Sequence, residues 1–148
     1  FKVLHITGER YYDAVKEQYG GDFGFATVVP YLHNMPEAYA AADAGVFRAG
    51  AITLAEVQAR QLPSVLIPSP NVTHNHQDWN ARTLEARGAA LVVREAEMST
   101  EKLASALRTV LTDDAARAGM QGALREVAQP EAARELAQAI MRIASRKR

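Results

Sequence analysis

The nine residues from Arg48 to Glu56 combine small, hydroxyl and carboxylate side chains at the start of a predicted helix. Gly50 and Ala51 leave the backbone with little bulk, so an anion can approach it closely. The free N–H groups and the positive dipole end of the following helix would then hold that anion. This segment therefore predicts a phosphate-binding turn.

Thr53 and Glu56 lie three residues apart and therefore share a face of this helix. In a nucleotide site, Thr53 would donate a hydrogen bond to a phosphate, and Glu56 would accept hydrogen bonds from both hydroxyls of a ribose cis-diol. The same spacing also fits a capping box, in which both side chains bond only to their own helix. These nine residues alone leave both interpretations open.

A second polar cluster, His74 to Asn80, contains six hydrogen-bonding side chains among seven residues. His76 and Asn80 are four residues apart and Gln77 and Asn80 are three apart, so they share one face of a predicted helix. Neutral amides and an imidazole suit a hydroxyl-rich ligand such as a sugar, because they offer donors and acceptors without charge. Two alternatives stay open: a polar helix start without a ligand, and a metal site that begins at His74 and His76, although no nearby Cys or third His supports it.

Short β-type runs alternate with helical patterns, which is typical of a parallel sheet covered by helices. We expect one α/β domain over residues 1–148, with a Rossmann-like parallel sheet and helices on both of its faces. The predicted strands cover residues 1–6, 25–29, 44–47, 64–67 and 90–93. The predicted helices cover residues 11–19, 34–42, 52–60 and 76–87, followed by C-terminal helices from about residue 99 with an interruption near Pro130.

Ligands of such sheets bind at the C-terminal ends of the strands. Four loops leave predicted strand ends, at residues 7–10, 30–34, 48–52 and 68–75, and three of the four carry candidate residues. This placement favours a binding site over helix capping alone.

Local signals also predict where helices begin and end. Asn34 and Ser99 are expected N-caps, while Gly20–Gly21 and Gly88 are expected to stop helices. After Ser99, apolar residues recur at helical spacing and form one stripe: Leu103, Leu107, Val110 and Leu111.

The composition excludes several classes of protein. The 148 residues contain no Cys, which rules out a disulfide framework and a thiolate nucleophile. Lys and Arg total 17, as do Asp and Glu, so no global charge attracts nucleic acid or anionic lipid. The basic stretch 142–148 is expected to be a solvated helix tail rather than a lipid or nucleic-acid contact. No apolar run approaches the ~20 residues of a membrane span.

The chain opens on an apolar strand without an initiator Met or a signal peptide, and we expect a fragment whose upstream part is absent.

The order of several motifs resembles the C-terminal, donor-binding domain of glycosyltransferase family 28, whose enzymes have the GT-B fold. The resemblance runs nearly the whole length and rests on these segments: Tyr31–Met35, Ala41–Asp43, Arg48–Glu56, Leu62–Pro63, Ile67–Pro68 and His76–Ala81. The Arg-x-Gly-Ala-x-Thr…Glu block followed by His-Gln-x-x-Asn-Ala is the specific part, since either half alone would be weak.

The resemblance implies a role for each matching position in binding UDP-N-acetylglucosamine. The Leu32 backbone would meet the uracil edge, and Glu56 would bind the ribose. The helix start would line the diphosphate and sugar through Gly50, Ala51, Ile52, Thr53, Leu54 and Ala55. The N-acetylglucosamine hydroxyls would contact His76, Gln77 and Asn80. Arg48 would flank the pyrophosphate, with a purely structural ion pair as the alternative.

The sequence departs from the family pattern in three ways. It lacks the first strand with its Gly-Gly-Ser-x-Gly loop, and it lacks the N-terminal acceptor-binding domain. We therefore expect the catalytic residues in the missing domain and no activity from this fragment alone. Phe47 stands where a small polar residue is common before the Arg.

The resemblance further implies an inverting transferase that moves N-acetylglucosamine from its UDP donor to lipid I, making lipid II for bacterial peptidoglycan. It implies no metal and no cofactor, and a complete enzyme that is cytoplasmic and peripheral on the inner membrane. Two alternatives remain: the catalytic subunit of another UDP-N-acetylglucosamine transferase with a separate acceptor subunit, or a non-enzymatic module that binds a nucleotide or a partner.

Overall fold

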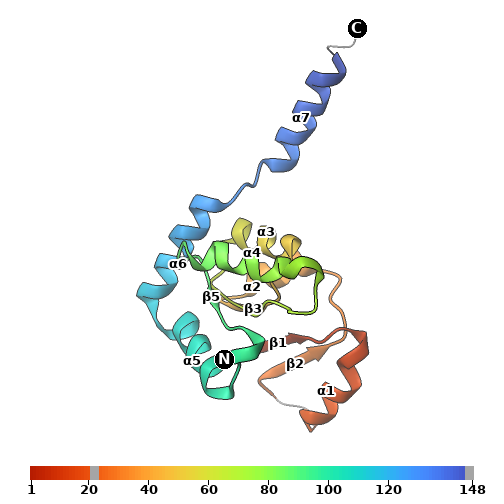
Figure 1. The fold of residues 1–148 in the computed structure, drawn as a ribbon. Helices are drawn as coiled ribbons and strands as arrows, with labels where there is room; N and C mark the ends of the chain where they lie inside the picture. Colours follow the sequence, from red (N-terminus) through yellow and green to blue (C-terminus); the bar gives the residue numbers. More distant parts are fainter. Residues whose placement is uncertain (21–23, 146–148) are drawn as a thin grey trace. The chain divides into compact units, whose positions relative to one another are not determined.

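The computed structural model describes residues 1–20 and 24–145, which form two compact units (Figure 1). The first unit covers Phe1–Ala38 and the second covers Tyr39–Arg148. All candidate residues except Leu32 belong to the second unit.

The first unit contains a two-stranded parallel sheet. Strand β1 (Val3–Ile6) pairs with β2 (Ala26–Val29), with Val3 opposite Ala26. A 3₁₀ turn, η1 (Glu9–Tyr11), and helix α1 (Tyr12–Gln18) follow β1. Parallel pairing requires such a crossover, which explains why a helix separates two short strands. Helix α2 (Met35–Ala41) begins in this unit, directly after Asn34.

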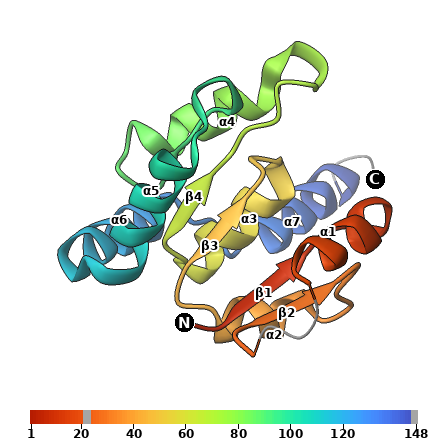
Figure 2. The same ribbon diagram turned by 90° about the horizontal axis from the view of Figure 1, so that it is seen from below.

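The second unit contains a three-stranded parallel sheet in the order β3 (Gly45–Phe47), β4 (Ser64–Leu66) and β5 (Leu91–Val92). Figure 2 shows β3 and β4 side by side with α3 beside β3. Helix α3 (Ala51–Arg60) connects β3 to β4, and helix α4 (His76–Glu85) connects β4 to β5. The remaining elements are η2 (Thr73–Asn75), η3 (Glu95–Glu97), α5 (Thr100–Thr112), α6 (Asp114–Val127) and α7 (Ala132–Ser145).

Helices cover both faces of this sheet because successive residues of a strand point to opposite sides. The buried Leu66 of β4 packs in a cluster with residues of α3 and α4, including Val57 and Leu84. Its neighbour Val65 packs in a second cluster with Val110 of α5. The two clusters make the sheet a central layer, as the sequence pattern predicts.

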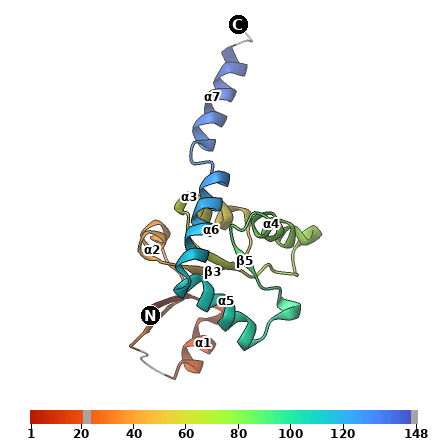
Figure 3. The same ribbon diagram turned by 90° about the vertical axis from the view of Figure 1, so that its left-hand side faces the viewer.

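The C-terminal helices follow their local signals. The Ser99 hydroxyl accepts a hydrogen bond from the Lys102 N–H at 3.1 Å, which confirms the predicted cap of α5. Asp113 caps α6 in the same way. Pro130 lies between α6 and α7, and α7 leads away from the sheet of its unit (Figures 1 and 3).

The structure differs from the sequence prediction in the number of sheets and in the end of helix α4. The described strands form two sheets, one in each unit, where we expected one. Helix α4 ends at Glu85, and Gly88 (φ +67°) makes the predicted left-handed stop after it. The predicted stop at Gly21 and the basic residues 146–148 lie outside the described residues.

Gly45 is the one position of β3 where the fold itself demands a glycine. The Phe47 ring lies over it, and a Cβ at position 45 would fall 2.2 Å from the ring carbons Cε2 and Cζ. Side chains two residues apart share a face of a strand, so the missing side chain at 45 makes room for the ring at 47.

We expect Gly45→Ala to lower the free energy of unfolding by about 1–3 kcal/mol, because the added methyl must displace the Phe47 ring. In a Phe47→Leu background the same change should cost less, since the ring carbons are gone. Urea unfolding of the four variants measures this coupling. Equal costs in both backgrounds would contradict the packing described here.

Candidate functional site

Helix α3 begins directly after the turn at the C-terminal end of β3. Gly50 is the N-cap residue in an extended conformation, and no side chain caps the helix. The Leu54 N–H donates to the Gly50 carbonyl at 2.9 Å, which is the first bond of the helix. The N–H groups of the first turn therefore lack partners within the helix and can meet a ligand.

The structure contradicts the capping-box interpretation of Thr53 and Glu56. Thr53 is the third residue of α3 rather than its N-cap, and its hydroxyl makes no capping bond. Glu56 lies one turn further along and interacts with Tyr39 instead. The helix starts at Ala51, one residue earlier than predicted, because Gly50 already provides the extended N-cap conformation.

Glycine at position 50 is not explained by the packing of the chain itself. Its φ of −70° is available to any residue, and an added Cβ would meet only the Thr53 hydroxyl oxygen, at 3.9 Å. That distance is an ordinary van der Waals contact. The absence of a side chain leaves the space in front of the first turn of α3 open.

Among the described residues, the Glu56 carboxylate has one hydrogen-bond partner. The Tyr39 hydroxyl of α2 donates a hydrogen bond to Glu56 Oε2 at 2.9 Å. Tyr39 is 7% exposed. Burial, together with the hydrogen bond to Glu56 and its negative charge, raises the pKa of Tyr39 to about 12. Sequence reasoning missed this residue, whose only signal was an aromatic side chain inside a predicted helix.

Asn80 connects α4 to the turn before α3. Its Nδ2 donates to the Ala49 carbonyl at 3.0 Å, and Ala49 is fully buried. A buried carbonyl needs a partner, and this side chain supplies it. Asn80 therefore fixes the residue that precedes Gly50, while its Oδ1 has no partner among the described residues.

Gln77 and His76 also bond to backbone at the start of α4. Gln77 Oε1 accepts a hydrogen bond from the Ser69 N–H at 2.9 Å, which ties α4 to the loop after β4. His76 Nδ1 donates to the Thr73 carbonyl at 2.9 Å. Each side chain keeps a second polar atom, Gln77 Nε2 and His76 Nε2, without a partner among the described residues. Their assignment to a sugar stays a prediction.

Arg48 forms the ion pair that the sequence left as its alternative role. Its guanidinium pairs with Glu95 and also donates to the Ile67 carbonyl at 3.3 Å. The Arg48 side chain is 55% exposed, so the pair lies at the surface. Surface pairs of this kind are weak, and an anion at the turn can compete for the guanidinium.

The other residues predicted around the helix start differ in exposure. Leu54 is buried in the core, so only its backbone can face a ligand. Ile52 is 77% exposed, and Ala51 and Ala55 are exposed as well. Leu32 follows β2 in the first unit, and its assignment to a uracil edge stays a prediction.

Asp78 anchors α4 to the end of the sheet. It is 8% exposed and accepts hydrogen bonds from Arg82 at 2.6 Å and Arg94 at 2.9 Å. Burial opposes its ionisation, but the bonds from Arg94 and Arg82 outweigh that effect and hold the pKa of Asp78 below its usual range. Arg94 also pairs with Glu85, so one guanidinium joins both ends of α4.

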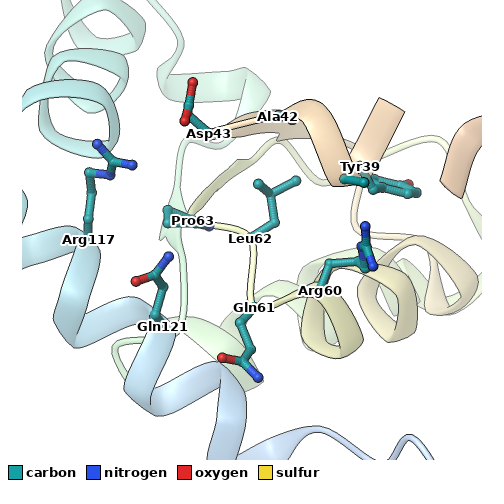
Figure 4. Close-up of a pocket in the computed structure, with 10 residues that line it drawn as sticks. Tyr39, Ala42, Asp43, Arg60, Gln61, Leu62, Pro63, Arg117 and Gln121 are labelled. Carbon is teal, nitrogen blue, oxygen red and sulfur yellow. The ribbon is translucent and has the colours of Figure 1, made fainter. Parts of the chain in front are cut away.

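Three cavities lie among the described residues of the second unit, two of them at opposite ends of β4 and one, of about 390 Å³, lined by residues of β5 and α5. One of about 260 Å³ adjoins the loop after β4 and includes Asp78 and Arg94. Another of about 200 Å³ lies where Leu62 and Pro63 enter β4, with Tyr39 and Arg60 on one side and Arg117 on another (Figure 4). None of the three is lined by a residue predicted for the site.

Two further findings concern the described residues. They contain no group of three or more His, Asp or Glu side chains arranged to hold a metal ion. None of their helices is both long enough and apolar enough to cross a bilayer.

Comparison with known proteins identifies a matching family and several similar proteins. The family model for the glycosyltransferase family 28 C-terminal domain matches residues 1–140. A protein of Symbiobacterium thermophilum, the UDP-N-acetylglucosamine–N-acetylmuramyl-(pentapeptide) pyrophosphoryl-undecaprenol N-acetylglucosamine transferase, is 63% identical over 147 residues, covering 99% of this chain and 39% of that protein. A Bacillus subtilis protein of the same name is 43% identical over 138 residues, covering 92% of this chain and 38% of that protein.

Solved structures agree with these relatives. The crystal structure of Acinetobacter baumannii MurG matches with a TM-score of 0.82 and 28% identity, over 96% of this chain and 41% of that one. The glycosyltransferase VinC in complex with dTDP matches with a TM-score of 0.68 at 18% identity, covering 98% of this chain and 42% of that one, which is a likeness of fold alone. The chain thus spans about two fifths of the length of the curated relatives it matches.

We expect Asp78→Asn to lower the free energy of unfolding at pH 7 by about 2 kcal/mol, the scale of hydrogen bonds to a charged group. Because the pKa of Asp78 is lowered by folding, its contribution is present above the unfolded pKa of about 3.9 and is lost as pH falls through the folded value. The stability difference between wild type and variant should therefore shrink below about pH 4. Urea unfolding between pH 3 and pH 7 measures it.

Asp114→Asn is the matched control, because the Asp114 side chain is 99% exposed and lies 4.0 Å from its Arg117 partner. It should change stability little at any pH. If the two variants behave alike, Asp78 does not anchor α4.

Proposed function

The chain belongs to the glycosyltransferase family 28 C-terminal domain family, and on that premise we propose that it binds the UDP-N-acetylglucosamine donor of an N-acetylglucosaminyltransferase. The relatives named for this reaction are 63% and 43% identical to it. The chain spans only part of their length, so the proposal concerns the donor half of a larger enzyme.

The observation that carries the proposal is the open first turn of α3 with a carboxylate one turn further along. Gly50 leaves the first N–H groups accessible without any requirement from the fold. These groups and the helix dipole suit a diphosphate. Glu56 lies about one turn away and suits the hydroxyls of the attached ribose.

The sugar of the donor would meet the polar side chains at the start of α4. Gln77 and Asn80 each use one end of the amide to bond to backbone, which fixes the direction of the other end. Gln77 then offers a donor and Asn80 an acceptor, and His76 Nε2 offers a further acceptor. This mixture suits hydroxyl groups better than a charged ligand.

In the complete enzyme, the 4-hydroxyl of the muramoyl group of lipid I would attack the anomeric carbon of the donor sugar, and UDP would leave. The bond from the anomeric carbon to the diphosphate oxygen breaks with inversion as the new glycosidic bond forms. The N–H groups at the start of α3 would stabilise the charge that develops on the departing diphosphate. Helix N–H groups would thus do the work that a metal does elsewhere, and the proposal includes no metal and no cofactor.

The remainder of the proposal concerns the whole protein. The acceptor-binding domain and the group that takes the proton from the attacking hydroxyl would lie outside this chain. The complete enzyme would work on the cytoplasmic face of the bacterial inner membrane as a peripheral protein, because its lipid acceptor is held there. Nucleic acid has no part in it.

We expect Glu56→Ala in the full-length protein to weaken use of UDP-N-acetylglucosamine by about 1.5–3 kcal/mol, because a hydrogen-bonded charged group is lost. Steady-state kinetics at varied donor concentration, expressed as kcat/KM, measure this. Glu135→Ala is the control, since Glu135 is exposed on α7, away from the sheet. Unchanged donor kinetics for Glu56→Ala would refute the proposed site.

We expect Gly50→Ala to weaken use of the donor while leaving the stability of the fold nearly unchanged. The stability should change by no more than about 1 kcal/mol, because the backbone conformation and the surrounding space accept a methyl group. Donor use should fall roughly 10- to 100-fold, because the methyl displaces the diphosphate from the N–H groups. Gly119→Ala in α6, where an added Cβ meets none of the described residues within 4 Å, is the control.

A further inference from the structure

The Tyr39 hydroxyl and the Glu56 carboxylate form a contact between α2 and α3. The hydroxyl donates to Oε2 at 2.9 Å, and the two residues are 17 positions apart in sequence. Tyr39 is buried, whereas Glu56 is half-buried. The contact therefore joins a core side chain to a carboxylate that reaches toward solvent.

The ring of Tyr39 packs against the ring of Phe47 in β3. The two ring centroids lie 5.8 Å apart with planes inclined by 52°, a favourable aromatic arrangement. Phe47 itself is held over Gly45, where no side chain competes for the space. The Tyr39 hydroxyl is consequently presented in one direction, and that direction is toward Glu56.

A carboxylate has two oxygens with about four acceptor positions, so one bond from Tyr39 leaves several free. We propose that Tyr39 is a positioning residue that holds the Glu56 carboxylate in the orientation needed to accept both ribose hydroxyls of the donor. The proposal rests on the proposed function, since it requires Glu56 to bind a ribose. Tyr39 acts through Glu56 and does not contact the donor.

Two further observations agree with this role. The pKa of Tyr39, raised to about 12, keeps its hydroxyl protonated and able to donate at any pH at which such an enzyme is assayed. A fixed carboxylate also avoids the loss of rotamer freedom that a mobile Glu side chain would suffer on binding. The energy of the ribose contact then appears as affinity.

Phe47 also affects the site, because its ring packs against the Tyr39 ring. A small side chain at position 47 would leave the Tyr39 ring without its neighbour, and Gly45 without the ring that covers it. The aromatic residue before Arg48 thus belongs to the support of Glu56 in this chain.

The experiment compares binding of UDP and 2′-deoxy-UDP to the full-length protein by calorimetry. Wild type should prefer UDP, because the deoxy ligand lacks one hydroxyl of the pair. Tyr39→Phe keeps the ring and removes only the hydroxyl. It should weaken UDP binding about 5- to 10-fold, leave 2′-deoxy-UDP binding within about 2-fold, and so reduce the preference for ribose.

Glu56→Ala and the double variant separate this proposal from the proposed function. Glu56→Ala should abolish most of the ribose preference, and adding Tyr39→Phe should then have no further effect, because the residue acts through the carboxylate. If Glu56→Ala leaves UDP binding unchanged, the proposed function itself fails. If Glu56→Ala weakens UDP binding but Tyr39→Phe does not alter the ribose preference, only the positioning role fails.

Two measurements keep a structural role apart from a positioning role. Tyr11→Phe, which removes a hydroxyl from a side chain that is 57% exposed, should leave both affinities unchanged. Thermal unfolding of Tyr39→Phe reports any loss of stability. An equal loss of affinity for both nucleotides, additive with Glu56→Ala, would mean that Tyr39 supports the fold alone and would overturn the proposal.

Discussion

The hydrogen bond from Asn80 to the Ala49 carbonyl is the constraint on which the candidate site depends. Ala49 is fully buried just before the open start of α3, so its carbonyl must find a partner inside the protein. The Asn80 side chain of α4 is that partner, and the next residue, Gly50, is the N-cap of α3.

This bond transmits the position of α4 to the turn. Helix α4 is itself fixed by Asp78, which two arginines hold, and by buried apolar residues on its inner face such as Leu84. Arg94 carries the connection to the end of β5. A series of charged and amide contacts thus runs from the sheet through α4 to the turn before α3.

Most of the fold could be predicted from sequence because its signals are local. Alternating runs placed the strands to within about two residues, and the cap at Ser99 depended only on residues up to Lys102. The interpretation of Thr53 and Glu56 as a capping box was wrong because it also relied on a local signal, the spacing of the two residues. Spacing alone does not reveal that the extended N-cap conformation already falls at Gly50, which shifts Thr53 into the helix.

The partners of the polar side chains could not be predicted in the same way. The face shared by His76 and Asn80 follows from helical periodicity, but the bond from Asn80 to Ala49 joins residues 31 positions apart. Tyr39 and Glu56 likewise meet only because β3 and two helices pack together. Such contacts depend on tertiary structure, and the periodicity of a helix or strand in the sequence does not indicate them.

Among helices α3 to α6, the helices with predicted site residues differ in their caps from those without. Ser99 and Asp113 cap α5 and α6 with their side chains, and these helices carry none of the predicted site residues. Helices α3 and α4 carry most of them, and neither has a side-chain cap. A capping side chain in place of Gly50 would add a few tenths of a kcal/mol to helix stability, but it would occupy the N–H groups that an anion requires. Helix α3 therefore gives up a local stabilising contact at the position where a ligand would replace it.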